Sequence, residues 1–167
     1  MWLPPALLPS GSCVFADMLQ YATCPSPFGN LRIGWEGDAI ISIRLGESSH
    51  HSPSPVSELA SRQLSEYFAG IRKSFTFPID LRGTPFQISV WEELAKIPYG
   101  QTVSYKDIAL AIGNEKAVRA VGMACNRNPV WIAIPCHRVI SSNRKLTGYA
   151  GGLTMKEALL KSESQQT

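Results

Sequence analysis

The second half of the chain contains three helix-start signals in close succession, and this pattern constrains the fold more than any other feature. The segment TPFQ, residues 84–87, combines a hydroxyl that can cap a helix, a proline suited to the first turn and a glutamine three residues after the cap. Ser104 with Asp107 is a second start, Gly113 ends that helix, and Asn114 is a candidate cap for a third helix that begins at once. The sequence therefore predicts a second half built from short helices.

The first half predicts strands and one helix. Residues 28–45 read as a hairpin, because the apolar runs FGNLRIGW and AIISIRL are separated by the turn formers EGD. Residues 56–71 have apolar side chains at near-helical spacing and predict an amphipathic helix. The segment KSFTFPID, residues 73–80, is expected to be a third strand, and nothing in this half suggests chemistry.

Together these patterns predict an α+β protein with two domains. We expect a small N-terminal α/β domain over residues 1–82, with an irregular extension at its start, and a mostly helical domain with a helix-turn-helix over residues 83–167. Prolines interrupt the extension and no Lys or Arg precedes Arg32, so it does not fit a signal peptide. No stretch approaches the roughly 18 to 20 apolar residues that a membrane-spanning helix needs.

Composition excludes some classes of protein and suggests a partner. The hydrophobic content of 44% excludes a disordered chain, and four cysteines without a CxxC pair argue against a disulfide scaffold and favour a reducing compartment. Residues 1–83 carry 6 Lys or Arg and 7 Asp or Glu, whereas residues 84–167 carry 10 and 6. A basic second half suggests a polyanionic partner, although a solvated surface gives the same count.

The third expected helix has small side chains around one long cation. The small residues are Ala117, Ala120, Gly122 and Ala124, and the cation is Arg119. A glycine inside a helix costs roughly 1 kcal/mol relative to alanine, so Gly122 should have a packing or functional reason. This face fits entry into a DNA groove, and it equally fits tight helix–helix packing. The second and third helices likewise have helix-turn-helix proportions that any helical hairpin can share.

The segment WIAIPCHRVI, residues 131–140, places a short polar insertion inside an apolar run. A reactive cysteine must be ionised to attack, and a neighbouring histidine or arginine favours the thiolate. On an extended backbone Cys136 and His137 would point to opposite faces, so the imidazole reaches the sulfur only through a turn or a bridging water. The alternative is a buried structural cysteine followed by an exposed basic pair, His137 and Arg138.

Three segments and the helix that follows them resemble the O6-alkylguanine-DNA alkyltransferase family, the methylated-DNA–protein-cysteine methyltransferases. The segments are RAVGMACNRNP, IPCHRVI and LTGYAGG, followed by KEALL. The resemblance extends from residue 83 to Glu163, whereas the first half resembles the family's ribonuclease H-like domain only in length and order of elements. It implies direct-reversal DNA repair, in which the protein flips O6-alkylguanine out of the duplex and transfers the alkyl group irreversibly to its own cysteine. O4-alkylthymine remains open as a second substrate.

The resemblance also implies catalytic roles. Cys136 matches the acceptor, His137 the residue that deprotonates it through a water, and Glu163 the acid that orients the histidine. Tyr105 matches a tyrosine that donates toward the base, and Lys156 lies at the far wall of the guanine pocket. Taken singly, Tyr105 also fits an ordinary core, Glu163 an exposed chain end, and Lys156 a solvated first turn after a capping box.

Further positions are carried over in the same way. Asn128 matches the catalytic asparagine that links the recognition helix to the site, and Arg119 matches the arginine that fills the gap left by the flipped base. The residues expected at the DNA minor groove, with low sequence specificity, are Tyr105, Arg119, Ala120, Gly122, Ala124 and Arg127. The residues expected to line the guanine pocket are Val139, Tyr149, Ala150, Gly151 and Gly152.

No metal and no cofactor are expected. Some family members hold a structural zinc in the N-terminal domain, but here the candidates Cys13, Cys24, His50 and His51 lack metal-ligand spacing. The expected partner is double-stranded DNA containing O6-alkylguanine, without a membrane, and the protein is expected to be a monomer. Its expected location is the cytoplasm, or the nucleus if the source is eukaryotic.

Two other function classes remain open. A Cys-His hydrolase would turn over repeatedly and would need an oxyanion hole, which nothing in the sequence marks. A non-enzymatic DNA-binding protein would be a lesion sensor or a helix-turn-helix regulator. Sensors of this kind lack the acceptor cysteine, whereas this chain retains Cys136, and a regulator would usually need a dimerisation segment, which is not evident.

Overall fold

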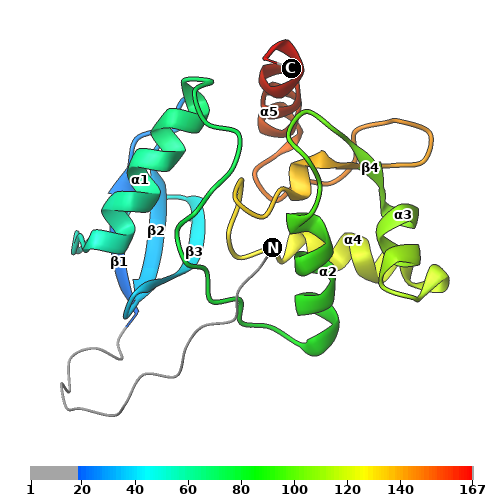
Figure 1. The fold of residues 1–167 in the computed structure, drawn as a ribbon, viewed down its shortest axis with the longest axis horizontal. Coiled ribbons are helices and arrows are strands. Elements are labelled where there is room, and N and C mark those ends of the chain that lie inside the picture. The colour runs from blue at the N-terminus through cyan, green and yellow to red at the C-terminus, as the bar shows by residue number, and fades with distance from the viewer. Residues whose placement is uncertain (1–18, 167) are drawn as a thin grey trace.

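The computed structural model describes residues 19–166 (Figure 1), so most of the N-terminal extension, with Cys13, lies outside the described residues. The strands are β1 (Gln20–Cys24), β2 (Leu31–Glu36), β3 (Ala39–Leu45), β4 (Val103–Ser104) and β5 (Val139–Ile140). The helices are α1 (Pro55–Phe68), α2 (Pro85–Ala95), α3 (Tyr105–Ala111), α4 (Val118–Asn126) and α5 (Leu153–Gln165), with short 3-10 turns η1 (Glu115–Ala117) and η2 (Cys136–Arg138). A small sheet with α1 is followed by a mostly helical half, which is the α+β arrangement that the sequence predicts.

The N-terminal sheet is antiparallel, with its strands in the order β1-β2-β3. The predicted hairpin over residues 28–45 is confirmed as β2 and β3, and Gly37 in its turn has φ 56°, which glycine adopts without strain. The prediction of a third strand over residues 73–80 is wrong. There Ile79 forms only an isolated bridge with Ile40 of β3, and Pro78 has no N–H for a ladder. The third strand of the sheet is β1, which pairs with β2 at the opposite edge.

Helix α1 covers one face of this sheet (Figure 1). Ser54 caps its start and forms a capping box with Ser57. Leu64 and Tyr67 on the inner face are buried in the core. The predicted helix is confirmed, but it ends before Gly70, whose φ of 75° stops the helical backbone.

The capping boxes predicted at Thr84 and at Ser104 are both present. The Thr84 side chain accepts from Gln87 N at the start of α2, and Ser104 accepts from Asp107 N at the start of α3. The third start differs from the prediction, because Asn114 makes no side-chain cap bond and η1 precedes α4. The backbone carbonyl of Asn114, rather than its side chain, accepts the first hydrogen bond of η1. None of the described helices is long and apolar enough to cross a membrane.

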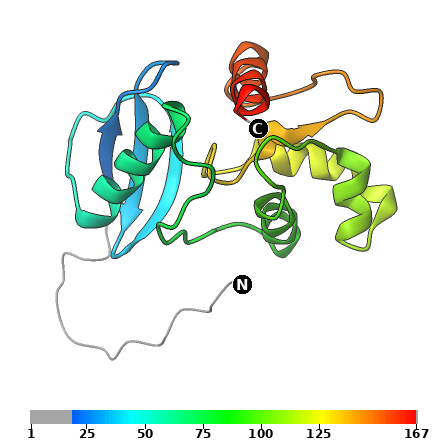
Figure 2. The same cartoon turned by 45° about the horizontal axis from the view of Figure 1, so that its top comes forward.

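A side-chain hydrogen bond ties two helices of the second half together, and backbone hydrogen bonds join the second half to the sheet. In the helical half, the Trp91 indole of α2 is 2% exposed and donates to the Ala124 carbonyl of α4 at 2.9 Å. Ile43 of β3 donates to the Pro129 carbonyl at 2.9 Å and accepts from Trp131 N at 3.1 Å. The chain that leads to η2 therefore runs beside the sheet. Figure 2 shows the sheet and α1 on one side, α2 to α4 on the other, and α5 above them.

Candidate active site

Cys136, His137 and Arg138 lie on the short turn η2, which Pro135 precedes. The turn removes the geometric difficulty noted from the sequence, because successive side chains on a 3-10 backbone do not point to opposite faces. Cys136 is 3% exposed, His137 0% and Arg138 5%. The alternative interpretation, with an exposed basic pair beside a structural cysteine, is therefore wrong.

Asn128 follows α4 and connects this helix to the cysteine. Its side chain is fully buried. Nδ2 donates to the Ile134 carbonyl at 2.7 Å and to Cys136 Sγ at 3.1 Å, while Oδ1 accepts from Val130 N at 3.0 Å. Three hydrogen bonds hold the amide in one orientation, so its donor stays directed at the sulfur, where it stabilises a thiolate more than a neutral thiol.

A buried carboxylate anchors the histidine. Glu163 of α5 is 0% exposed, and its Oε1 lies 2.7 Å from His137 Nε2, while Arg138 donates to both carboxylate oxygens at 2.9 Å. The exposed position considered for Glu163 is therefore wrong. An ionised carboxylate only accepts, which assigns the shared proton to His137 Nε2 and leaves Nδ1 with its lone pair. Nδ1 is buried and has no hydrogen-bond partner among residues 19–166, so it can serve as a base.

Burial and hydrogen bonds set the charge of each group. Burial raises the pKa of Glu163, but hydrogen bonds from His137 and Arg138 outweigh it and hold the pKa well below its usual range. Burial lowers the pKa of His137 more than the bond to Glu163 raises it, so the imidazole is neutral at pH 7. Burial raises the pKa of Cys136 to about 11, which the hydrogen bond from Asn128 offsets only in part. The resting thiol therefore keeps its proton, in contrast to the ionised sulfur expected from the sequence.

Lys156 and Tyr105 converge on one backbone carbonyl. The Lys156 side chain is buried, and Nζ donates to the Val139 carbonyl at 2.6 Å and the Thr147 carbonyl at 2.8 Å. The Tyr105 hydroxyl donates to the same Thr147 carbonyl at 3.2 Å, and its ring lies 5.8 Å from the ammonium. Lys156 does lie near the start of α5, but the solvated position considered for it is wrong, because the side chain is 0% exposed. The capping box predicted at this helix start is also absent, since α5 begins after Gly152 without a side-chain cap.

The residues predicted to line the guanine pocket form a packed wall at one end and a surface loop at the other. Tyr149 is 9% exposed and packs against Trp131, with ring centroids 5.8 Å apart. A Cβ on Gly151 would lie 2.8 Å from the Tyr149 ring, so only glycine fits there. Ala150 and Gly152 are exposed. The Tyr149 hydroxyl is buried without a partner among the described residues, which leaves it able to bond an entering ligand.

The predicted DNA-contacting residues of α4 do not all face outward. Arg119, Ala120 and Arg127 are exposed, and Gly122 is half-buried. A Cβ on Gly122 would lie 3.9 Å from the Tyr105 ring, which is ordinary contact. Tight packing therefore does not explain this glycine. Ala124 is only 2% exposed, so it belongs to the core and the prediction that it contacts DNA is wrong.

Sequence reasoning missed two kinds of residue around the site. On the surface of α4, Met123 is 57% exposed and Val118 is 37% exposed, beside Arg119. Their helical positions could have indicated this exposure, whereas Tyr67 had no such signal. Its hydroxyl, from α1, donates to Glu163 Oε1 at 2.6 Å. The first half, in which the sequence suggested no chemistry, therefore contributes a hydroxyl to the site. Helical spacing identified Tyr67 only as a core residue.

The described part of the chain has no cluster of three or more His, Cys, Asp or Glu side chains that could hold a metal ion. Of the sequence candidates, Cys24 is buried, with its thiol 3.8 Å from the Ser61 carbonyl. His51 Nδ1 accepts from Thr23 N at 3.1 Å. Cys13 lies outside the described residues, and the absence of zinc stays a prediction.

Two family models match the chain. The model of the 6-O-methylguanine DNA methyltransferase ribonuclease-like domain matches residues 19–81, and that of the DNA binding domain matches residues 85–165. The constitutive methylated-DNA–protein-cysteine methyltransferase of Bacillus subtilis is 46% identical over 154 residues, which cover 86% of this chain and 93% of the relative. The methyltransferase of the same name from Methanosarcina acetivorans is 48% identical over 153 residues, or 87% and 98% of the two chains.

Solved structures show the same similarity. The crystal structure of Mycobacterium tuberculosis O6-methylguanine methyltransferase has a TM-score of 0.82 and 43% identity, and the match covers 90% of this chain and 95% of that one. The crystal structure of Mycobacterium tuberculosis OGT in complex with DNA has a TM-score of 0.82 and 44% identity, covering 88% and 94%.

Proposed function

Because the chain belongs to the methylated-DNA–protein-cysteine methyltransferase family, which repairs DNA by direct reversal, we propose that it transfers the O6-alkyl group of guanine to its own Cys136. This assignment rests on the groups that lie next to the Cys136 sulfur. A fixed amide donor reaches Sγ at 3.1 Å, and the next residue in the chain is a neutral histidine whose Nδ1 is free. This arrangement favours loss of the thiol proton when a substrate is bound.

The thiol must lose its proton during the reaction. A pKa of about 11 leaves roughly one thiol in ten thousand ionised at pH 7. In the proposed reaction, the proton moves from Sγ through a water to His137 Nδ1, and Glu163 stabilises the imidazolium that forms. The buried carboxylate stays ionised throughout, because Arg138 and His137 hold its pKa low.

Alkyl transfer then exchanges one bond for another. The sulfur attacks the alkyl carbon, the new C–S bond forms as the C–O6 bond breaks, and the bond's electron pair remains on the purine oxygen. The purine gains a proton at N1, so the net reaction moves the thiol proton to guanine and leaves a thioether on Cys136. Tyr105 is proposed to donate toward the purine as its negative charge grows. Water does not readily hydrolyse a thioether, so each molecule reacts once.

The proposed DNA surface is the exposed face of the helix-turn-helix. Arg119, Ala120 and Arg127 lie on it with the half-buried Gly122, and Met123 adds an apolar contact. Small side chains let the backbone approach the minor groove, and the long Arg119 side chain can occupy the space of a flipped base. Such contacts depend little on sequence, as a repair protein requires.

Further expectations stay proposals. We place the boundary between the domains at residues 82 and 83, and we propose that the protein acts as a monomer without a cofactor. Its substrate is double-stranded DNA, so we expect it wherever the genomic DNA lies, in the cytoplasm or in a eukaryotic nucleus.

Intact mass measurement tests the assignment. The protein is incubated with a duplex that contains one O6-methylguanine, and the expected result is a gain of one methylene per chain, localised to Cys136 by peptide mapping. Cys136→Ala should gain nothing, while Cys125→Ala, which removes the other thiol of the second half, should react like the wild type. Continued product release without a mass gain would instead indicate a hydrolase. Tight binding without modification would indicate a lesion sensor.

A further inference from the structure

A tyrosine from the first half of the chain reaches the carboxylate of the active site. Tyr67 of α1 is 3% exposed, and its hydroxyl donates to Glu163 Oε1 at 2.6 Å. The same oxygen lies 2.7 Å from His137 Nε2, and the Tyr67 hydroxyl is 3.5 Å from that nitrogen. The hydroxyl therefore contacts the histidine–carboxylate pair where the Nε2 proton is shared.

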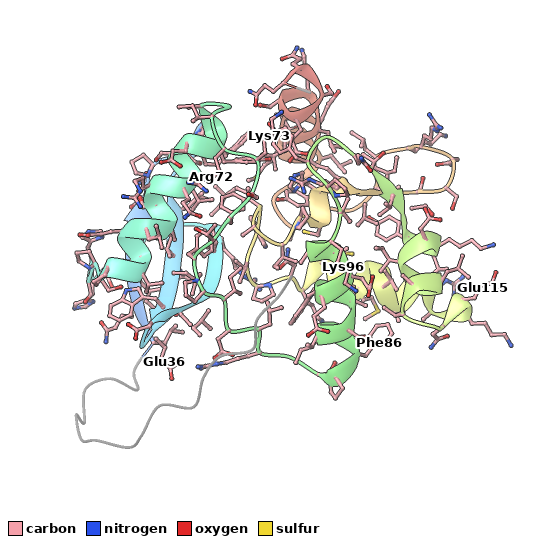
Figure 3. All side chains as sticks on the ribbon, viewed as in Figure 1. Glu36, Arg72, Lys73, Phe86, Lys96 and Glu115 are labelled. Carbon is pink, nitrogen blue, oxygen red and sulfur yellow. The ribbon has the colours of Figure 1, made fainter. Side chains whose placement is uncertain are left out.

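Contacts around the ends of α1 and α5 hold this hydroxyl in place. The Tyr67 ring packs edge-on against Tyr99, with centroids 6.0 Å apart and planes at 81°. Gly70, after α1, lies against the Gln166 side chain, and Lys73 donates to the Gln166 carbonyl at 2.9 Å. Figure 3 shows Lys73 on the segment that leaves α1 and passes beside α5. These contacts between segments far apart in the sequence therefore direct the Tyr67 hydroxyl at Glu163.

The hydroxyl competes with the histidine for one oxygen. Oε1 of Glu163 accepts from Tyr67, from His137 and from Arg138 Nη2, at 2.6, 2.7 and 2.9 Å. Each added donor disperses the negative charge of that oxygen, so the carboxylate attracts the His137 proton less strongly. A weaker pull keeps the imidazole neutral, which is the state that can accept a proton on Nδ1.

We propose that Tyr67 is a positioning residue for alkyl transfer, because its hydroxyl orients the Glu163 carboxylate and limits how strongly that carboxylate polarises His137. The proposal rests on the proposed function, since it concerns the base that receives the Cys136 proton. By this route the N-terminal domain completes the catalytic machinery of the second half.

The charged and titratable groups near the imidazole come from several elements. They are Tyr67 from α1, Cys136 and Arg138 from η2, Lys156 and Glu163 from α5, and Tyr99 behind the carboxylate. Among these groups, the Tyr67 hydroxyl can be removed without changing a formal charge at neutral pH. Its removal therefore isolates one hydrogen bond.

The test compares single-turnover rates from pH 5 to pH 9 on a duplex containing O6-methylguanine. Tyr67→Phe should slow transfer about tenfold at pH 7, the loss typical of a hydrogen bond to a charged group. It should also move the acid limb of the rate profile, where protonation of His137 slows transfer, to higher pH, because the carboxylate then attracts the His137 proton more strongly. Tyr99→Phe is the matched control, because the Tyr99 hydroxyl donates to Gln166 Oε1 at 2.6 Å instead of to the carboxylate. It should leave the rate and the acid limb as in the wild type.

A second variant gives a shift in the opposite direction. Site-specific 3-fluorotyrosine at position 67 has a more acidic hydroxyl and is a stronger donor, so the acid limb should move to lower pH. The proposal is overturned if Tyr67→Phe reacts like the wild type, if Tyr99→Phe changes the profile equally, or if the rate falls while the profile stays in place. Absence of transfer in the wild type would instead overturn the proposed function.

Discussion

The Asn128 side chain donates to Cys136 Sγ across 3.1 Å, and the same amide group also donates to the Ile134 carbonyl. The contact joins the segment that follows α4, the helix proposed to face DNA, to the sulfur proposed to accept the alkyl group. In the proposed function, docking of α4 on DNA would therefore be linked mechanically to the proposed acceptor atom.

Removing that amide should affect chemistry and stability together. Asn128→Ala leaves the buried Val130 N–H without its acceptor and takes one donor from the Ile134 carbonyl and one from the sulfur, so we expect a free-energy loss of about 2 kcal/mol and alkyl transfer at least about tenfold slower. Urea unfolding and single-turnover kinetics measure the two effects. Asn126→Ala, at the exposed last residue of α4, should change neither the stability nor the transfer rate. Wild-type kinetics in Asn128→Ala would contradict this role.

The resting thiol should titrate far above neutrality. With the pKa of Cys136 raised to about 11, alkylation of this sulfur by iodoacetamide should rise about tenfold per pH unit from pH 7 to 9.5. Peptide mapping after timed labelling follows Cys136 separately from the other cysteines. A plateau below pH 9 would show that the sulfur is ionised in the free protein.

Acid should destabilise the fold through Glu163. Its folded pKa lies well below the value of about 4.3 for an exposed glutamate, so the ionised carboxylate stabilises the fold above that pH. The stabilisation is lost as the pH falls from about 4.3 through the folded pKa. Glu163→Gln should be less stable at pH 7, by about 3 kcal/mol, because Arg138 loses its buried partner. Urea unfolding across pH should show a shallower acid loss for this variant than for the wild type, and equal slopes would contradict the assignment.

The buried ammonium of Lys156 should hold β5 and the loop at Thr147 together. Lys156→Met keeps the length of the side chain but removes the lysine donor from the Val139 carbonyl and leaves the Thr147 carbonyl with the Tyr105 hydroxyl, so we expect the free energy of unfolding to fall by about 2 kcal/mol. Lys161→Met, an exposed position on the same helix, should be nearly neutral. Thermal unfolding of both variants provides the comparison. Equal melting temperatures would mean that the two hydrogen bonds contribute nothing.

Arg119 should matter for duplex DNA and not for the chemistry. Arg119→Ala is expected to slow repair of a duplex by about tenfold or more, because no side chain replaces the flipped base, while reaction with free O6-methylguanine stays unchanged. Arg62→Ala, an exposed arginine on α1, should behave like the wild type on both substrates. Equal losses on duplex and free base would place Arg119 in folding or catalysis instead.

Local signals in the sequence were sufficient for several elements. The capping boxes at Thr84 and Ser104 predicted where α2 and α3 begin, because cap, proline and turn chemistry act within a few residues. The prediction of a strand over residues 73–80 failed because a segment's own pattern does not decide whether it pairs with a sheet. Phe75 and Phe77 suggested a strand face, but this segment forms only one isolated bridge, from Ile79 to Ile40 of β3, while β1 pairs with β2 as the third strand.

By itself, the sequence determined the β2–β3 hairpin, the starts of α2 and α3 and the residue types that can carry the chemistry, since these depend on neighbours along the chain. Tertiary structure alone decided that Ala124 faces the core, that the Cys136 thiol is neutral at rest, and that Tyr67 meets Glu163. Burial, charge state and contacts between distant segments depend on how α1, α5 and η2 pack in space, and no local pattern carries that information.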